Sequence, residues 1–368
     1  MVWAVTHHDT LQELLADPRV GKNPQLWTAF REGLLPEGWP LITFVTVPGM
    51  ITADGADHRR LRGLVTQAFT PRRVAALQPA VEARAVALLD RIAGLEGASE
   101  GFDLREHFAY PLPMQVIGEL LGLPPKQQDE LHELSDTLVS SSATPEAAVA
   151  AQQSLFALLG SVVAAKRAEP GDDLTTDLIA AREDEDRLSE TELVGTLLLM
   201  LVAGHETTLN LITNAVRALL AHPGQLRLVL EGTVPWSAVV EETMRYDSPV
   251  GQFPLRYASE DIPVGDAVIR RGEALLASYA AAGRDGAHYP DADRFDVTRQ
   301  PNRHLSFGHG PHFCLGSGLA RLEAETALRL LFERYPALAL ADGPVPEPIG
   351  SFVSNSVRTL RVTVRTLR

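Results

Sequence analysis

The chain has 368 residues, a formal net charge of −14 and a single cysteine. This length is enough to bury a sizeable core, and one cysteine excludes a disulfide framework and fits a reducing compartment. The acidic balance argues against nucleic acid as a partner. The N-terminus carries no apolar signal segment, and the longest apolar run, Leu193 to Gly204, is too short to cross a bilayer. We therefore expect a cytoplasmic protein without a membrane anchor.

Helical segments rich in Leu and Ala dominate the chain, and strand-like runs are short and few. The first predicted elements are a strand at 2–6, a helix at 9–16 and an irregular stretch at 21–55 that contains several prolines. A loop of that length in a globular protein is usually functional or a lid. Further helices are predicted at 56–68, 71–93, 111–121, 126–140 and 146–167.

A longer helix is predicted from Ser189 to His222. Ser189 and Glu192 form a capping box at its start, and Pro223 follows its end. The segment 197–202 is apolar all round, which is typical of a helix buried in a large core. This helix is expected to be the spine of the fold.

Polar residues interrupt this helix at mid-length, in the segment 203–208. The small residues Ala203 and Gly204 would let a flat cofactor and a diatomic ligand approach the backbone. Glu206 and Thr207 supply an acid and a hydroxyl for a proton relay. A zinc-protease interpretation of the His-Glu pair fails, because the second histidine would fall at Leu209. A helix kink with satisfied polar groups is the structural alternative.

The only cysteine, Cys314, lies in the glycine-rich segment 307–316, directly ahead of a predicted helix at 319–328. The glycines permit tight turns around the sulfur. Unpaired amides and the positive end of the helix would lower the pKa of the Cys314 thiol. A buried free cysteine is the alternative. The setting favours a thiolate ligand to haem iron, which promotes O–O cleavage.

This segment resembles the signature of the cytochrome P-450 superfamily of haem-thiolate monooxygenases. The signature is filled without a gap by Phe307, Gly310, His312, Cys314 and Gly316. The segment 203–208 is similar to the family's oxygen-activating motif, with Glu where many members have Asp. Members usually begin with several dozen more residues, which contribute a helix and a first strand, so we expect those elements to be missing here.

The resemblance implies haem b (iron protoporphyrin IX) with Cys314 as the ligand to its metal. His58 and Arg62 share a face with apolar residues and need an anionic partner, which the haem propionates would supply. Arg256 and His312 occupy the other positions where family members grip propionates. The remaining expected cofactor-binding residues are Phe307, Gly308, Ala203 and Gly204.

Glu242 and Arg245 lie three residues apart and match the family's Glu-x-x-Arg motif. On their own they would be a common surface pair. The resemblance implies a buried structural network completed by a basic residue, for which Arg294 matches. The implied substrate contacts include the stretch 45–52 and Ser354, and point to a bulky, mostly apolar compound. The other expected substrate contacts are Met200, Ala203, Val250, Gln252, Phe253 and Val353.

Basic residues gather in two stretches that, in the family, flank the sulfur side of the haem where an acidic electron donor docks. An ordinary solvated helix face is the alternative interpretation. These residues are Arg59, Arg60, Arg72 and Arg73, with Arg321 after the cysteine.

The expected fold is mainly α: a single cytochrome P-450 domain over 1–368 with small peripheral β-sheets. The expected function is O2-dependent monooxygenation of a steroid, macrolactone or similar natural product in secondary metabolism, with electrons from NAD(P)H through a reductase and a ferredoxin. A peroxide-driven peroxygenase and a non-catalytic haem-binding partner protein are the alternatives. The intact Glu206–Thr207 pair argues against the first, and the presence of both Cys314 and Thr207 argues against the second.

Overall fold

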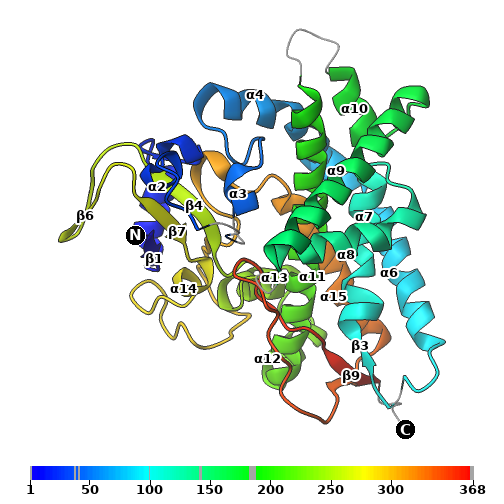
Figure 1. The fold of residues 1–368 in the computed structure, drawn as a ribbon. Coiled ribbons are helices and arrows are strands. Elements are labelled where there is room, and N and C mark those ends of the chain that lie inside the picture. Colours follow the sequence, from blue (N-terminus) through cyan, green and yellow to red (C-terminus); the bar gives the residue numbers. More distant parts are fainter. Residues whose placement is uncertain are drawn as a thin grey trace.

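The computed structural model describes residues 2–36, 39, 42–98, 100–140, 143–181 and 188–364. Helices make up most of the chain, as expected (Figure 1). The α-helices are α1 His8–Ala16, α2 Thr28–Arg31, α3 Ile42–Thr46, α4 Gly55–Thr66, α5 Pro71–Ala76, α6 Gln78–Ala93, α7 Pro111–Leu120, α8 Gln128–Val139, α9 Pro145–Ala168, α10 Leu174–Ala181, α11 Glu190–Ala221, α12 Pro223–Leu230, α13 Trp236–Tyr246, α14 Tyr279–Gly283 and α15 Ser317–Arg334.

Short helical turns and strands complete the described chain. The turns are η1 Pro24–Leu26, η2 Gln67–Phe69, η3 Arg105–Ala109, η4 Pro125–Gln127 and η5 Gly310–His312. The strands are β1 Val2–Val5, β2 Val20–Gly21, β3 Phe102–Asp103, β4 Phe253–Ala258, β5 Ile262–Val264, β6 Ala267–Ile269, β7 Ala274–Ala277, β8 Leu338–Leu340 and β9 Arg361–Val364.

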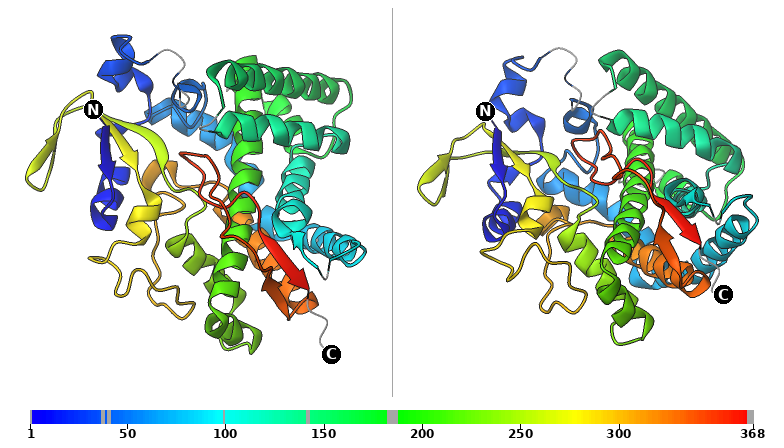
Figure 2. Two further views of the ribbon diagram at one scale, coloured as in Figure 1. Left: turned by 60° about the horizontal axis from the view of Figure 1, so that its bottom comes forward. Right: turned by 90° about the horizontal axis from the view of Figure 1, so that it is seen from below.

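Helix α11 runs through the middle of the helical part of the molecule, as both turned views show (Figure 2). The predicted capping box starts it: Ser189 Oγ accepts from Glu192 N at 3.1 Å, and the Glu192 carboxylate accepts from Ser189 N at 2.7 Å. One end of α11, Leu193–Leu201, packs into one hydrophobic core, and Leu209–Leu219 packs into another. The polar segment 203–208 therefore lies where α11 passes from one core to the other.

A four-stranded sheet with the order β1-β7-β4-β2 lies to one side of the helices (Figure 1). β1 pairs with β7 in parallel, and β4 pairs antiparallel with both β7 and β2. The sheet brings the end of β2, followed by Lys22, beside the β4 strand that carries Arg256. In this way it places two cationic side chains from distant parts of the sequence at one place.

Most of the expected helices are confirmed, and two expectations about local structure are wrong in part. The stretch 21–55 is not wholly irregular, because η1, α2 and α3 lie within it. The helix expected over 71–93 is divided at Leu77 into α5 and α6. Pro79 at the start of α6 explains the division, since proline is compatible with the first turn of a helix and not with its interior.

Within the described residues, α9 and α11 have the length and composition of a membrane span, with mean hydropathies of 1.6 and 1.2. In α11, 72% of this window is buried inside the protein, as in the core helix of a soluble protein, against 28% in α9. Two such helices are weak evidence for a membrane.

Candidate active site

A largely apolar cavity separates α11 from the loop that carries Cys314, and Ala203, Gly204, Thr207 and Cys314 all line it. Ala203 is exposed within the cavity, although it lies in the middle of a mostly buried helix. The two sides of the cavity are thus formed by the two motifs that the sequence singled out. Their separation by a largely apolar space fits an apolar cofactor between the sulfur and α11.

The cysteine loop is held by close backbone packing. The amide of Cys314 donates to the Phe307 carbonyl at 2.8 Å, and Gly308 and Gly310 adopt φ values of +73° and +72°. A Cβ atom on Gly310 would lie 2.6 Å from the Leu15 carbonyl oxygen, so no larger residue fits there. Gly308 and Gly310 are required by this geometry, whereas Gly316 has a φ of −82° and open space around its Cβ position.

The protonation of Cys314 differs from the expectation. Burial raises the pKa of the Cys314 thiol, and the Gly316 amide and the guanidinium groups of Arg62 and Arg321 only partly oppose it. The amides and the helix start are therefore not sufficient to make a thiolate by themselves. A coordinated metal ion deprotonates a thiol directly, which makes iron binding the dominant cause of the thiolate.

One part of the cavity, called the cationic end, is lined by the basic side chains that the sequence predicts for propionate binding. His58 and Arg62 come from α4, Arg256 from β4 and His312 from η5. The rings of His58 and His312 lie 4.1 Å apart, and Arg62 Nη2 donates to the Phe313 carbonyl at 2.7 Å. Arg256 is only 7% exposed. Desolvation by burial lowers the pKa of Arg256, and it also lowers the pKa of His312 to about 4.

Sequence reasoning missed three members of this cationic end. The buried Lys22 donates from Nζ to the Leu255 carbonyl at 3.0 Å, and Tyr279 lines the cavity and hydrogen bonds to Arg256. Asp54 lies 3.7 Å from His312 Nε2 and accepts from the amides of Lys22 and Asn23. The buried guanidinium of Arg256 pairs with no carboxylate among the described residues and needs an anion, which a propionate would supply.

Thr207 and Glu206 lie on different sides of α11, because successive helical residues are rotated by about 100°. Thr207 lines the cavity and donates from Oγ1 to the Ala203 carbonyl at 2.8 Å. Glu206 is 4% exposed and does not line the cavity; its Oε1 accepts from Asn210 Nδ2 at 3.0 Å and lies 3.8 Å from Arg105 Nη2. The expected acid and hydroxyl are adjacent in sequence but do not face one another.

A cluster of titratable side chains surrounds Glu206 on that far side. Burial raises the pKa of Glu206 to about 7, and the pKa of Asp136 on α8 is raised by burial as well. The negative charge of Asp136 contributes to the rise in the pKa of Glu206. Because double ionisation of two neighbouring carboxyl groups is disfavoured, the pair keeps one proton near neutral pH. The Asp136 side chain is 51% exposed, so this pair extends from the interior to solvent.

Two neutral histidines adjoin the carboxyl pair. His205 Nδ1 lies 2.7 Å from the Leu201 carbonyl, and His205 Nε2 lies 3.3 Å from His132 Nδ1. Since the carbonyl can only accept, His205 carries its proton on Nδ1, and His132 Nδ1 donates to His205 Nε2. His132 Nε2 then faces Asp136 Oδ2 at 3.6 Å. Burial lowers the pKa of both histidines to about 4.

The Glu242–Arg245 pair is fully buried, and Arg245 Nη2 and Nε donate to the Glu242 carboxylate at 2.7 and 2.8 Å. The expectation that Arg294 completes this network is wrong. The Arg294 side chain is 63% exposed and pairs with Asp296, so that only its backbone carbonyl reaches Arg245. The basic side chain beside Glu242 is Arg299, whose Nε lies 3.5 Å from the carboxylate.

The expected substrate-contacting residues divide into two groups. Met200, Val250 and Phe253 line the cavity, together with Met50 and Ile51 from the stretch 45–52. The remaining three are not among the described residues that line it, so their assignment as cavity contacts is wrong. Val353 and Ser354 are buried, Gln252 is half-buried, and the Val353 carbonyl accepts from the Gly251 amide. The apolar walls missed in sequence analysis include Ile117, Leu199 and Leu211.

The basic surface stretch is partly neutralised by its neighbours. Arg60 pairs with Glu192 at 2.7 Å and Arg73 with Asp177 at 3.2 Å, whereas Arg59 and Arg72 are exposed. Arg321 donates to Glu241 at 2.6 and 3.0 Å and stacks over the Phe307 ring at 4.4 Å. Arg321 is therefore held against the cysteine loop and contributes less free charge than the sequence alone indicated.

Comparison with known proteins agrees with this geometry. Residues 236–359 match the family model for cytochrome P450. Cytochrome P450 107B1 from Saccharopolyspora erythraea is 43% identical over 93% of this chain and 84% of its own length. The 2-hydroxy-5-methyl-1-naphthoate 7-hydroxylase from Streptomyces carzinostaticus is 41% identical over 99% of this chain and 90% of its own. The testosterone-bound structure of CYP154C4 from Streptomyces sp. ATCC 11861 has a TM-score of 0.96 at 46% identity, covering 99% and 90% of the two chains.

The fold and the cysteine site are those of a haem-thiolate oxidoreductase, and these identities extend along nearly the whole chain. The chain belongs to the cytochrome P450 family and is a P450 monooxygenase. Members bind haem b through a cysteine thiolate, and Cys314 is the only cysteine here. The chemistry of the donor set fits that group, because the sulfur, the largely apolar cavity and the cationic end are all present.

Proposed function

We propose that this enzyme inserts one oxygen atom of O2 into a C–H or C=C bond of a bulky, mostly apolar natural product such as a steroid or macrolactone. The second oxygen atom leaves as water, with two electrons from NAD(P)H and two protons. The observation that carries the proposal is the cavity between Cys314 and Thr207, whose lining also includes Met50, Met200 and Phe253. Relatives that act on a naphthoate or hold testosterone support a ring-shaped substrate.

When bound, thiolate-ligated haem supplies the activation of O2. The chain's own residues provide positioning and protons. Apolar side chains exclude bulk water from the cavity, which limits loss of protons and electrons to side reactions. The Thr207 hydroxyl, which now donates to the Ala203 carbonyl, can turn to donate into the cavity and accept from a water molecule. Thr207 therefore holds the proton next to the reacting oxygen.

Glu206 and Asp136 form the reserve from which that proton is replaced. The Asp136 side chain is exposed to solvent. Glu206 is buried and directly precedes Thr207 in the sequence of α11. A shared proton can pass from Asp136 to Glu206 without the burial of a new charge, because the pair keeps one negative charge throughout. Rotation of the Glu206 side chain, or a water molecule, would carry the proton around the helix to Thr207.

A peroxide-driven peroxygenase is the alternative activity. Hydrogen peroxide brings its own two protons, so that reaction does not need an inlet from solvent. The carboxyl pair that leads from the surface to α11 favours the O2-dependent reaction. A non-catalytic haem-binding partner protein would need neither this pair nor an apolar cavity open to Thr207.

We further propose that the enzyme works in the cytoplasm and receives electrons from a ferredoxin and its reductase. The described chain offers Arg59 on α4 and Arg72 on α5 as exposed basic side chains, which fits an acidic donor. The other two arginines of that stretch, Arg60 and Arg73, form ion pairs with Glu192 and Asp177.

The test is a screen of steroids, macrolactones and aromatic acids for the spectral shift that accompanies substrate entry beside haem iron. Hits are then incubated with NADH, a ferredoxin, its reductase and 18O2. The proposal predicts product that carries one labelled oxygen atom and depends on the reductase. Product that forms with peroxide alone and carries no label from 18O2 would favour the peroxygenase instead. If the enzyme converts none of the hits to product, the result would favour a non-catalytic haem-binding partner protein.

A further inference from the structure

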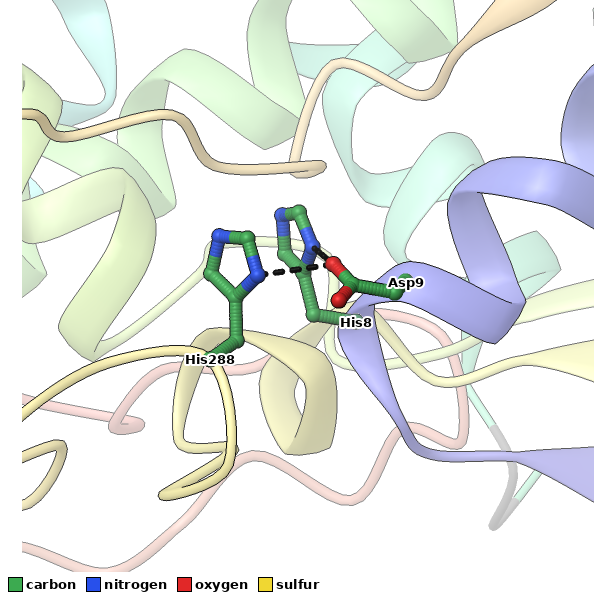
Figure 3. A group of neighbouring side chains, drawn as sticks. All are labelled: His8, Asp9 and His288. Carbon is green, nitrogen blue, oxygen red and sulfur yellow. Dashed lines mark hydrogen bonds and ion pairs between the residues drawn. The ribbon is translucent and has the colours of Figure 1, made fainter.

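Two histidines and an aspartate that do not line the Cys314 cavity converge beside one another (Figure 3). His8 and Asp9 begin α1, and His288 lies in the segment between α14 and the cysteine loop. His8 Nδ1 lies 2.9 Å from Asp9 Oδ1, and His288 Nδ1 lies 2.7 Å from the same oxygen. The two imidazole rings are stacked with centroids 3.5 Å apart. Two ring nitrogens thus face one carboxylate oxygen.

The hydrogen bonds of His8 place two acceptor atoms against each other with no proton or cation between them. His8 Nε2 lies 3.0 Å from the Arg303 carbonyl, which can only accept, so Nε2 carries the proton. In a neutral imidazole Nδ1 is then an acceptor, and it faces Asp9 Oδ1, which is also an acceptor. A second proton on His8 would relieve this conflict. It would, however, place a cation against the stacked ring of His288, on a side chain that is only 2% exposed. A metal ion bound to both nitrogens and the carboxylate also relieves it.

We propose that His8, Asp9 and His288 bind a divalent metal ion of the zinc class. Two imidazole nitrogens and one carboxylate oxygen suit Zn²⁺, Ni²⁺ or Cu²⁺ and do not suit Mg²⁺ or Ca²⁺, which prefer oxygen ligands alone. A water molecule would complete a tetrahedral site. The bond from His8 Nε2 to the Arg303 carbonyl is the second-shell contact that orients a metal-binding imidazole through its other nitrogen.

The spacing of the ligand atoms is compatible with such an ion. Zinc bonds of about 2.0–2.1 Å hold tetrahedral ligand atoms about 3.3 Å apart. The Asp9 oxygen lies 2.9 and 2.7 Å from the two nitrogens and must therefore move outward by about half an ångström. Its side chain is 76% exposed and free to move, and the same exposure gives an ion a path from solvent. His8 stays fixed because it is buried, whereas the His288 ring must turn out of its stack with His8, because the in-plane lone pairs of two nearly parallel rings cannot both point at one ion.

The surrounding backbone holds the start of α1 and the segment before His288 together before an ion arrives. The Asp285 carboxylate accepts from the His8 amide at 2.9 Å and from the Ala287 amide at 2.9 Å, which ties the segment before His288 to the start of α1. The Arg303 carbonyl, which His8 contacts, comes just before the cysteine loop. The metal ion would therefore clip α1 to the segment that leads into the haem site and stabilise the contact between them.

The experiment uses the haem-loaded protein without a polyhistidine tag, after removal of divalent ions with a chelator. Isothermal titration with Zn²⁺ measures affinity and stoichiometry, and Mg²⁺ serves as the control metal. The variants are His288→Ala and Asp9→Ala, and His7→Ala is the matched control because His7 is exposed and adjacent but contacts Asp285 instead. Haem content and the spectrum of the carbon monoxide complex check that each variant is folded.

The proposal predicts one Zn²⁺ per chain in the wild type and in His7→Ala, and no specific binding of Mg²⁺. Loss of a direct ligand should weaken Zn²⁺ binding by more than the roughly 10–100-fold that loss of a second-shell partner costs. Zn²⁺ should also raise the unfolding temperature of the wild type and not that of His288→Ala. Equal Zn²⁺ affinity in wild type and His288→Ala, or no binding by the wild type, overturns the proposal and leaves His8 as a protonated partner of Asp9.

Discussion

Glu242→Gln should destabilise the protein strongly, because it leaves the guanidinium of Arg245 buried without its counter-charge. Both side chains are 0% exposed, and the Glu242 carboxylate accepts from Arg245, Asn302 and the Asp296 amide. Arg245 keeps its bonds to the Gly283, Ala292 and Arg294 carbonyls, so it cannot leave the interior. Removal of one partner of a buried pair costs about 3–5 kcal/mol, and we expect a loss in that range.

The matched control is Arg294→Ala. The Arg294 side chain is largely exposed, and its ion pair with Asp296 is long at 3.8 Å. Its removal should therefore change the free energy of unfolding by no more than about 0.5 kcal/mol. Arg299→Ala should fall between the two, because Arg299 is 9% exposed and 3.5 Å from Glu242. Urea unfolding followed by circular dichroism and by haem release gives the free energies. A loss below about 1 kcal/mol in Glu242→Gln, or an equal loss in Arg294→Ala, would refute the network as described.

Three further predictions concern the reaction. Thr207→Ala removes a hydroxyl that lines the cavity but little volume, so NADH consumption should fall much less than product, with hydrogen peroxide as the difference; an unchanged ratio of product to NADH would move proton delivery to Thr208. The raised pKa of Glu206, about 7, means that its acid form is lost as pH rises through that value, so product per NADH should fall above pH 7. Because the Asp136 charge helps to raise this pKa, Asp136→Asn should move the fall to lower pH, and a profile identical to wild type would contradict the pair. Charge reversal at Arg59 and Arg72 should weaken ferredoxin-driven turnover at low salt and leave peroxide-driven turnover nearly unchanged; equal losses in both assays would indicate damage to the fold.

The parts of the structure that sequence predicts well are those encoded by neighbouring residues. The capping box at Ser189, the proline after α11 and the glycine-rich loop around Cys314 are local signals, and each has the expected geometry. The cysteine and the polar segment 203–208 are both diagnostic because they lie in short patterns with fixed spacing. Their meeting across one cavity followed from the family resemblance and not from the local pattern.

The parts that sequence missed depend on contacts between distant segments. Lys22 reaches the carbonyl of Leu255, and Arg105 reaches Glu206 from a different helix, with no pattern near either residue to mark the contact. Arg294 was preferred over Arg299 because the position matched, and only the course of the turn at 291–294 decides which side chain points to Glu242. Glu206 and Thr207 appeared as a pair in sequence, although the helix turns them to opposite environments.

Glu323 on α15 is another residue that no local pattern marked. It lines the cavity, and its Oε2 has no hydrogen-bond partner among the described residues. Burial raises its pKa well above the usual range, which favours the neutral acid form of this carboxyl group. Such a group is costly to bury as an anion, and its acid form is compatible with the apolar surroundings of the site.

The central claim is that Cys314 is the thiolate ligand of haem iron, and the absorption spectrum of the reduced protein with carbon monoxide tests it most directly. The account predicts the strongly red-shifted band of a thiolate-ligated haem in the wild type. In Cys314→His that band should be absent while part of the haem stays bound through the cationic end of the cavity, which includes Arg62, Arg256 and Lys22. Persistence of the red-shifted band in Cys314→His would contradict the account.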